Sequence, residues 1–289
     1  MSRSARMGRE KLGYAQTLCV KAAGKAMQQA RMFHPGARIG VAVSGGVDSF
    51  VLLKTLSLRR RIVPFRFDIM VLHLNPGFDP HNHEALFPWL ERNGIASHVE
   101  CTDHGTHAHS AENLRRSPCF RCAWLRRKRL FELCARYSLT HLALGHTADD
   151  LESTFFMNLF QNGRVDGLSM REAFFGGKLT LIRPLLLVRK KDILRAARQW
   201  DLPVWSNPCP SAGRTRRDDM REALEHVYAV DPSARNRVMG GLTRWQLGRH
   251  VGKGETPEPP SPQKSLFPPD GTATDAAHAC SRYGLLKDV

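Results

Sequence analysis

The sequence predicts an α/β fold: a doubly wound, parallel sheet of approximately five strands with helical additions toward the C-terminus. Short apolar runs alternate with longer segments of helical spacing between residues 38 and 200. This is the order that a parallel sheet with helices on both faces requires. Turn-forming Gly, Pro and Asn residues separate the segments. Hydrophobic residues make up 42% of the 289-residue chain, enough to bury a core.

Each element follows from its local pattern. The β-prone apolar runs predict strands, and the periodic segments between turns predict helices. Residues 102–118 are polar and are expected to be irregular, and Gly163 is expected to cap the helix before it. The expected strands are 38–43, 67–74, 95–101, 140–144 and 178–182, and the expected helices are 10–33, 50–60, 83–92, 122–137, 148–162, 190–200, 215–229 and 232–247.

The net charge of +16 and the pI of about 10.1 predict a polyanionic partner. The basic residues concentrate in residues 1–38, 115–129 and 214–221. None of these stretches has an obvious apolar insertion face, so nucleic acid is favoured over a membrane surface, with a merely solvated basic surface as the alternative. The sequence has neither a run of 18 apolar residues nor a secretory apolar core after its basic start, so a cytoplasmic protein is expected.

The most specific motif is SGGVDS at residues 44–49, between a predicted strand and a predicted helix. Both glycines are expected to take positive φ and to let the backbone approach a ligand closely. The loop N–H groups and the positive end of the helix dipole would then face a phosphate, and the loop carboxylate would hold Mg²⁺. The Walker sequence GxxxxGK[ST] is absent, and SGGxDS resembles the PP-loop ATP pyrophosphatase superfamily. The expected nucleotide-binding residues here are Ser44, Gly45, Gly46, Asp48 and Ser49.

A second polar segment, GHTADD at residues 145–150, follows the fourth predicted strand. Thr147 is suited to cap the next helix, and Asp149 and Asp150 suit its first turn. Because the carboxyl ends of parallel strands meet at one edge of the sheet, these carboxylates are also placed to bind Mg²⁺ beside the phosphate loop. Capping and metal binding are both compatible with the pattern. The segment resembles the second nucleotide motif of the PP-loop enzymes that modify tRNA.

Cys119 and Cys122 form a CxxC pair at the start of a predicted helix, where the dipole and the neighbouring arginines are expected to lower the thiol pKa. The pair alone is compatible with zinc, an iron–sulfur site or, less well, a redox pair, since no thioredoxin-like unit surrounds it. Cys209, which lies 87 residues further on in Pro-Cys-Pro, is the other conspicuous thiol. Three thiolates suit a cubane that keeps one iron open. Zinc would need a fourth ligand, for which the candidates are His104, His107 and His109.

The motifs together resemble the tRNA 2-thiocytidine synthetase family over about residues 20–247. They are SGGVDS, CFRC before a basic helix, LALGHTADDLEST, MNLFQNG, LIRPLL and the late Pro-Cys-Pro. The resemblance implies that Cys119, Cys122 and Cys209 hold a 4Fe–4S cluster with one open iron. It also makes Asp48 the catalytic loop aspartate and puts Gly145 and His146 in the nucleotide pocket. Two departures, Val47 in place of Lys and the single late cysteine, bear on which tRNA position is modified.

The resemblance implies an ATP-dependent tRNA thiolase that releases AMP and pyrophosphate. The C2 oxygen of a pyrimidine, expected to be a cytidine of the anticodon loop, is adenylated and then replaced by sulfur. ATP, Mg²⁺ and the cluster are the expected cofactors, with adenine near Leu72, His73 and Gly145. tRNA and an unidentified sulfur donor are the expected partners, and a homodimer is left open. The alternatives are thiolation of uridine, or a zinc-stabilised PP-loop protein that binds nucleotide or RNA without sulfur transfer.

The sequence also predicts how the chain is organised around this site. A basic helical segment (1–37) precedes an ATP-binding domain (38–205), followed by a helical segment with the third cysteine (206–250) and a disordered, proline-rich tail (251–289) that includes Cys280. Basic side chains are expected to grip the RNA backbone. The expected tRNA contacts are Arg126, Arg127, Arg129, Arg216 and Arg217.

Overall fold

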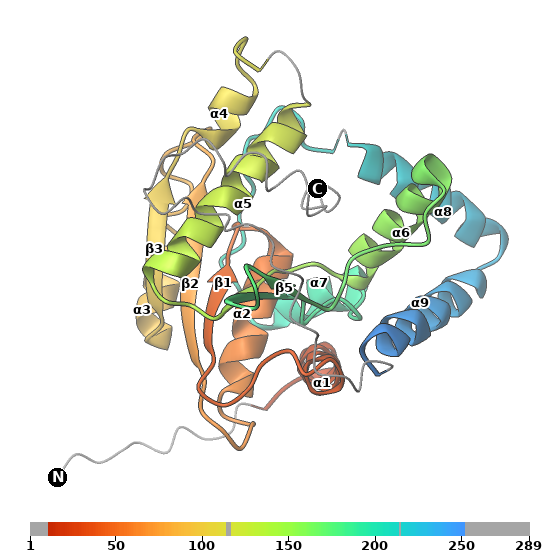
Figure 1. Ribbon diagram of the computed structural model, residues 1–289, viewed down its shortest axis with the longest axis horizontal. Coiled ribbons are helices and arrows are strands. Elements are labelled where there is room, and N and C mark those ends of the chain that lie inside the picture. Colours follow the sequence, from red (N-terminus) through yellow and green to blue (C-terminus); the bar gives the residue numbers. More distant parts are fainter. Residues whose placement is uncertain (1–10, 114–116, 214, 252–289) are drawn as a thin grey trace.

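The computed structural model describes residues 11–113, 117–213 and 215–251 (Figure 1). The predicted tail from residue 252, with Cys280, lies outside the described residues, as do 1–10, 114–116 and 214 of the basic segments. In the described part, the strands form one sheet in the order β3-β2-β1-β4-β6-β5. The strands are β1 (Arg38–Ala42), β2 (Asp68–Asn75), β3 (Ala96–Cys101), β4 (His141–Ala143), β5 (Arg171–Phe174) and β6 (Leu179–Ile182). The helices are α1 (Tyr14–Gln29), α2 (Val47–Arg59), α3 (Leu86–Asn93), α4 (His104–Ala108), α5 (Pro118–Arg136), α6 (Ala148–Asn162), α7 (Lys190–Gln199), α8 (Arg216–Val230) and α9 (Ala234–Val251).

The sheet confirms the predicted α/β class and adds one strand to it. β1 to β4 and β6 are parallel, and β5 pairs antiparallel with β6. β5 was not predicted because its four residues alternate between exposed and half-buried at the sheet edge and contain no apolar run. The turn before β6 supplies the hairpin, with Gly176 and Gly177 at positive φ. The short α4 also lies in a segment predicted to be irregular.

Helices cover both faces of the sheet, as the doubly wound prediction requires (Figure 1). On one face α1, α2 and α7 pack together, and Phe50, Leu53 and Leu56 of α2 are fully buried there. On the other face, α5 packs Leu133 against a cluster that includes Leu72 of β2. Burying each such side chain contributes about 1.5–3 kcal/mol. None of the helices within the described ranges is both long and apolar enough to cross a membrane.

The two polar loops meet because β1 and β4 are neighbours in the sheet. A Cβ atom at Gly145 would lie 3.1 Å from the backbone at Asp48 and Ser49. Glycine at this position therefore allows the loop after β4 to approach the loop after β1 closely. The predicted cap of α6 is also present, since Gly163 has a φ of 60° in the left-handed region. This packing places both motifs at the carboxyl edge of the sheet, where ligands bind in such folds.

Candidate functional site

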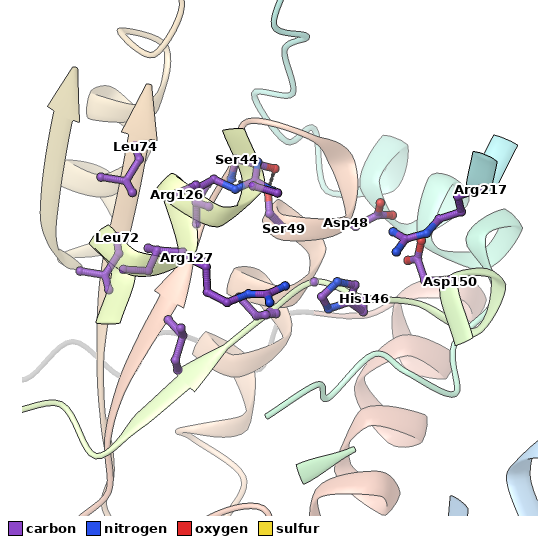
Figure 2. A pocket seen from close by; sticks show the side chains of 17 residues that line it. Ser44, Asp48, Ser49, Leu72, Leu74, Arg126, Arg127, His146, Asp150 and Arg217 are labelled. Atoms are coloured by element: carbon purple, nitrogen blue, oxygen red, sulfur yellow. Dashed lines mark hydrogen bonds between the residues drawn. The ribbon is translucent and has the colours of Figure 1, made fainter. Parts of the chain in front are cut away.

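A cavity of about 290 Å³ lies at the carboxyl ends of β1, β2 and β4 (Figure 2). Both predicted loops line it, together with α5 from one side and α8 from the other. The wall is apolar on the β2 and β4 side and strongly polar on the loop side. The polar lining residues are Ser44, Asp48, Ser49, Arg126, Arg127, His146, Asp150 and Arg217, and the larger apolar ones are Leu72, Leu74, Leu130, Leu142 and Leu144.

The SGGVDS loop is held in shape by its own hydrogen bonds. Ser49 Oγ donates to the carbonyl of Gly46 at 2.7 Å, and the N–H of Ser44 donates to Ser49 Oγ at 3.2 Å. Gly45 has a φ of +91°, and a Cβ atom there would lie 2.3 Å from the indole of Trp205. Gly46 has a φ of −73°, so the prediction of positive φ holds for Gly45 only. The loop is therefore preformed at the N-terminus of α2, which suits an anion.

The carboxylate of Asp48 is paired with Lys190, a residue that the sequence analysis missed. Lys190 Nζ lies 2.5 Å and 2.7 Å from the two carboxylate oxygens. Lys190 is the first residue of α7, and its backbone N–H donates to Asp149 Oδ2 at 2.7 Å. Burial raises the pKa of Asp48, and the Lys190 ammonium opposes this shift. The positive end of the helix dipole repels a lysine at a helix N-terminus unless an anion lies nearby. The position of Lys190 at the start of a predicted helix was therefore the sequence signal for an acidic partner.

Asp149 and Asp150 play different parts. Asp150 forms the capping box of α6: its Oδ2 accepts from the N–H of Thr147 at 2.8 Å, and Thr147 Oγ1 accepts from the N–H of Asp150. Its other oxygen accepts from Arg221 at 2.6 Å. Asp149 faces a second cavity of about 170 Å³ that Asp48, Asp150, Lys190 and Arg221 also line. Within the described ranges, no three His, Cys, Asp or Glu side chains are grouped to hold a single metal ion.

The structure corrects the prediction for His73. Side chains alternate along β2, so Leu72 and Leu74 line the cavity while His73 is fully buried outside its lining. Its Nδ1 lies 2.7 Å from the carbonyl of Val43, and its ring packs against Trp205. Burial lowers the pKa of His73 to about 4. His73 is therefore a neutral core residue beneath the loop, outside the lining of the cavity.

Of the three cysteines predicted as ligands, Cys119 and Cys209 both act electrostatically on Cys122. Cys119 and Cys122 are the second and fifth residues of α5, and all three thiols are half-buried and free. Burial raises the pKa of Cys122, and the charges of Cys209 and Cys119 add to this rise. The predicted lowering of the thiol pKa is thus wrong for Cys122, since burial outweighs the opposing charge of Arg126. Cys122 lies within electrostatic range of both partner thiols.

Cys209 is tethered directly to the nucleotide loop. The N–H of Trp205 donates to the carbonyl of Gly45 at 3.0 Å, and Asn207 Nδ2 donates to the carbonyl of Ser44 at 3.3 Å. These bonds hold the segment after α7, which carries Cys209, against the nucleotide loop. The nucleotide loop and the third thiol therefore belong to one connected unit.

Two of the three histidines considered as zinc ligands have other side-chain partners. His109 Nδ1 lies 2.9 Å from the carbonyl of Gly105, and its Nε2 lies 2.9 Å from Ser211 Oγ. His107 Nδ1 lies 3.2 Å from a carboxylate oxygen of Glu112. Both ring nitrogens of His109 are thus engaged, and its contact with Ser211 supports the segment that carries Cys209.

The basic residues divide into two groups. Arg126 and Arg127 of α5 and Arg217 of α8 line the main cavity, and Arg216 is exposed. Arg129 donates to both carboxylate oxygens of Glu100 at 2.8–3.1 Å and to Glu132 at 2.9 Å. Because its guanidinium is already held by two carboxylates, the prediction of an RNA contact at Arg129 is not supported. Its role here is to join α5 to β3.

The fold and the site define the class of this protein. The family described as "PP-loop domain" matches residues 20–227, which include both loops, the CxxC pair and Cys209. The fold also resembles the solved structure of the U34-tRNA thiolase NcsA from Methanococcus maripaludis with its [4Fe-4S] cluster. That match has a TM-score of 0.64 and 20% identity, covering 85% of this chain and 89% of the other. The chain is a PP-loop protein.

Curated relatives narrow the assignment further. The tRNA-cytidine(32) 2-sulfurtransferase of Geobacter metallireducens is 31% identical over 230 residues, which are 79% of this chain and 89% of the relative. The protein of the same name from Syntrophotalea carbinolica is 33% identical over 233 residues, covering 80% and 90% of the two chains. The chain belongs to this sulfurtransferase family within the PP-loop proteins, which confirms the resemblance drawn from the motifs.

Proposed function

We propose that this protein is an ATP-dependent tRNA sulfurtransferase that replaces the C2 oxygen of a cytidine with sulfur. The observation that carries the proposal is a single cavity lined by the SGGVDS loop and by α5, the helix that begins with the CxxC pair. A phosphate loop and thiols beside one cavity suit a reaction that activates an oxygen with ATP and then delivers sulfur. The relatives named tRNA-cytidine(32) 2-sulfurtransferase favour cytidine over uridine.

The cavity offers matching partners for each part of ATP. The loop N–H groups and the α2 N-terminus suit the phosphates, whose charge Arg126, Arg127 and Arg217 would offset. The apolar wall formed by Leu72 and Leu142 suits a nucleobase. Gly145, which lets the second loop pack closely on the first, also lines the cavity.

The proposed reaction needs two displacements. The O2 atom of the cytidine attacks the α-phosphorus of ATP, and the bond to the bridging oxygen breaks so that pyrophosphate leaves with its electron pair. A sulfur nucleophile then adds to C2, and the adenylated oxygen leaves as AMP. ATP is needed because a carbonyl oxygen is a poor leaving group. The loop N–H groups and the cavity arginines would stabilise the charge that develops on the phosphates in the first step.

An iron–sulfur cluster is the cofactor that the thiols fit best. The proposed ligands are Cys119, Cys122 and Cys209, of which Cys119 and Cys209 act electrostatically on Cys122, and no three His, Cys, Asp or Glu side chains are grouped around a metal position in the described part of the chain. In a cubane each iron takes one thiolate, so three thiolates need not meet at one atom, whereas zinc requires four ligands around one ion. Bound there, the cluster would supply an iron with an open position for sulfur.

The proposal includes a Mg²⁺ ion bound to Asp48, provided that the ion displaces the Lys190 ammonium group. Both oxygens of Asp48 already accept hydrogen bonds from Lys190. A magnesium ion arriving with the nucleotide would have to displace this ammonium group, which would then face the phosphates. In either arrangement a cation separates the Asp48 carboxylate from the phosphate charge.

Turnover of an unmodified tRNA by anaerobically purified protein tests the proposed function. With ATP and sulfide, we expect AMP and pyrophosphate in a one-to-one ratio with 2-thiocytidine, measured by mass spectrometry of the digested tRNA. ADP and phosphate as products would contradict the assignment of the loop. Thiouridine in place of thiocytidine would contradict the choice of base while leaving the reaction class intact.

The salt dependence of tRNA binding tests the basic surface. Changing Arg126 or Arg216 to Ala should weaken binding to all tRNAs and lower the slope of log K against log[salt] by about 0.7–0.9 for each lost phosphate contact. Arg92→Ala is the matched control, because this exposed arginine ends α3 at the amino edge of the sheet, away from the cavity. An unchanged slope in the Arg126/Arg216 double variant would show these side chains to be merely solvated.

A further inference from the structure

Arg183 is the largest of the fully buried side chains in the described part of the chain. It follows β6 directly and is only 1% exposed. Its Nη1 donates to the carbonyl of Ser169 at 2.6 Å and to Glu172 Oε2 at 2.9 Å. Its Nε donates to Nδ1 of His146 at 3.3 Å. In the sequence it lies within the LIRPLL motif.

The contact with His146 determines where the imidazole carries its proton. A guanidinium group in a protein only donates hydrogen bonds and does not lose its charge. Nδ1 of His146 must therefore accept, which leaves the proton of a neutral ring on Nε2. No bond to Nε2 is found from the described residues, and the side chain lines the cavity (Figure 2). Nε2 is thus the nitrogen available to a ligand.

The charges around His146 keep it neutral. Burial lowers its pKa, and the positive charges of Arg183, Arg217 and Arg127 lower it further, while Asp150 opposes them. These groups come from the β6 end, α8, α5 and α6, so the ring is faced mainly by cations. A ring that stays neutral has a fixed tautomer as long as Arg183 occupies Nδ1.

We propose that Arg183 is a positioning residue that holds His146 as the Nε2–H tautomer, so that His146 donates a hydrogen bond to an oxygen atom of the bound nucleotide. That the ligand is a nucleotide rests on the proposed function. The tautomer of His146 does not depend on that function. It also excludes His146 as a general base in the first displacement, because one ring nitrogen is occupied by Arg183 and the other already carries a proton.

Nitrogen-15 NMR of histidine-labelled protein without nucleotide tests the tautomer, and the His146→Gln spectrum identifies the His146 signals. We expect an unprotonated Nδ1 and a protonated Nε2 from about pH 6 to about pH 9. Arg183→Met should mix the tautomers and raise the pKa of His146, while Glu172→Gln, which spares the Arg183–His146 bond, should leave the spectrum unchanged. A protonated Nδ1 in the wild-type protein would overturn the proposal, whether or not the Arg183 variant folds and whether or not the protein thiolates tRNA.

Binding of the ATP analogue with a methylene group between the α- and β-phosphorus atoms tests the donated bond. The side-chain N–H₂ of Gln reaches the position of Nε2, and that of Asn reaches only that of Nδ1. His146→Gln should therefore keep affinity near that of the wild type, and His146→Asn should lose about tenfold. Equal loss in both variants, or better binding by the Asn variant, would contradict a donor at Nε2.

Discussion

Replacing Asp48 with Asn is expected to lower the rate of AMP and pyrophosphate formation by about 100-fold or more, the range seen when one preorganised electrostatic group is removed from an active site. The variant keeps the shape of the side chain but loses the charge that holds Lys190 at 2.5 Å. Without it, neither the ammonium group nor a magnesium ion is held between α2 and the phosphates. Quantifying pyrophosphate release with saturating ATP and tRNA gives the rate directly.

Asp68→Asn provides the matched control for this prediction. Asp68 begins β2 at the opposite edge of the sheet and is exposed, so the substitution removes the same charge away from the cavity. The Asp48 variant should retain its fold by circular dichroism, because Asp48 is a partly exposed residue in the first turn of α2 rather than a core side chain. An Asp48→Asn rate within about threefold of the wild-type rate would contradict a role for this carboxylate in the reaction.

The two loops could be predicted from sequence because each combines a strand, a short polar turn and a helix start within about ten residues. The pairing of Lys190 with Asp48 could not, because the two residues are far apart in the chain and only the packing of α7 against α2 joins them. The hydrogen bond between Arg183 and His146 could not be predicted for the same reason, because the two residues follow different strands. Long-range contacts of single side chains leave no periodic signal.

The errors have equally specific physical causes. His73 was assigned to the nucleotide because it adjoins Leu72, yet neighbouring residues of a strand face opposite sides of the sheet. Arg129 was grouped with Arg126 by charge alone, but Glu100 on β3 neutralises it. β5 escaped prediction because an edge strand of four residues needs no apolar run. In each case the position or partner of the residue depends on its neighbours in the folded structure, which the sequence composition does not show.

Hydrogen bonds connect the nucleotide loop with the segment that carries Cys209. Trp205 and Asn207 bond the carbonyls of Gly45 and Ser44, and Asn82 in turn donates to Asn207 at 2.5 Å. A nucleotide that settles on the loop therefore contacts the same backbone that positions the third thiol. These bonds hold the segment that carries Cys209 against the nucleotide loop.

Changing Cys119, Cys122 or Cys209 singly to Ala is expected to remove the broad absorbance near about 400 nm of an anaerobically purified cluster and to abolish 2-thiocytidine formation. ATP binding should persist, because none of the three thiols lines the main cavity. Cys101→Ala is the control: this exposed thiol on β3 should leave both the spectrum and the activity unchanged. A colourless wild-type protein with one equivalent of zinc, or a Cys209 variant that keeps its absorbance, would contradict the cluster. The Cys209 variant is the most decisive of the three, since this thiol lies 87 residues beyond the CxxC pair in the sequence.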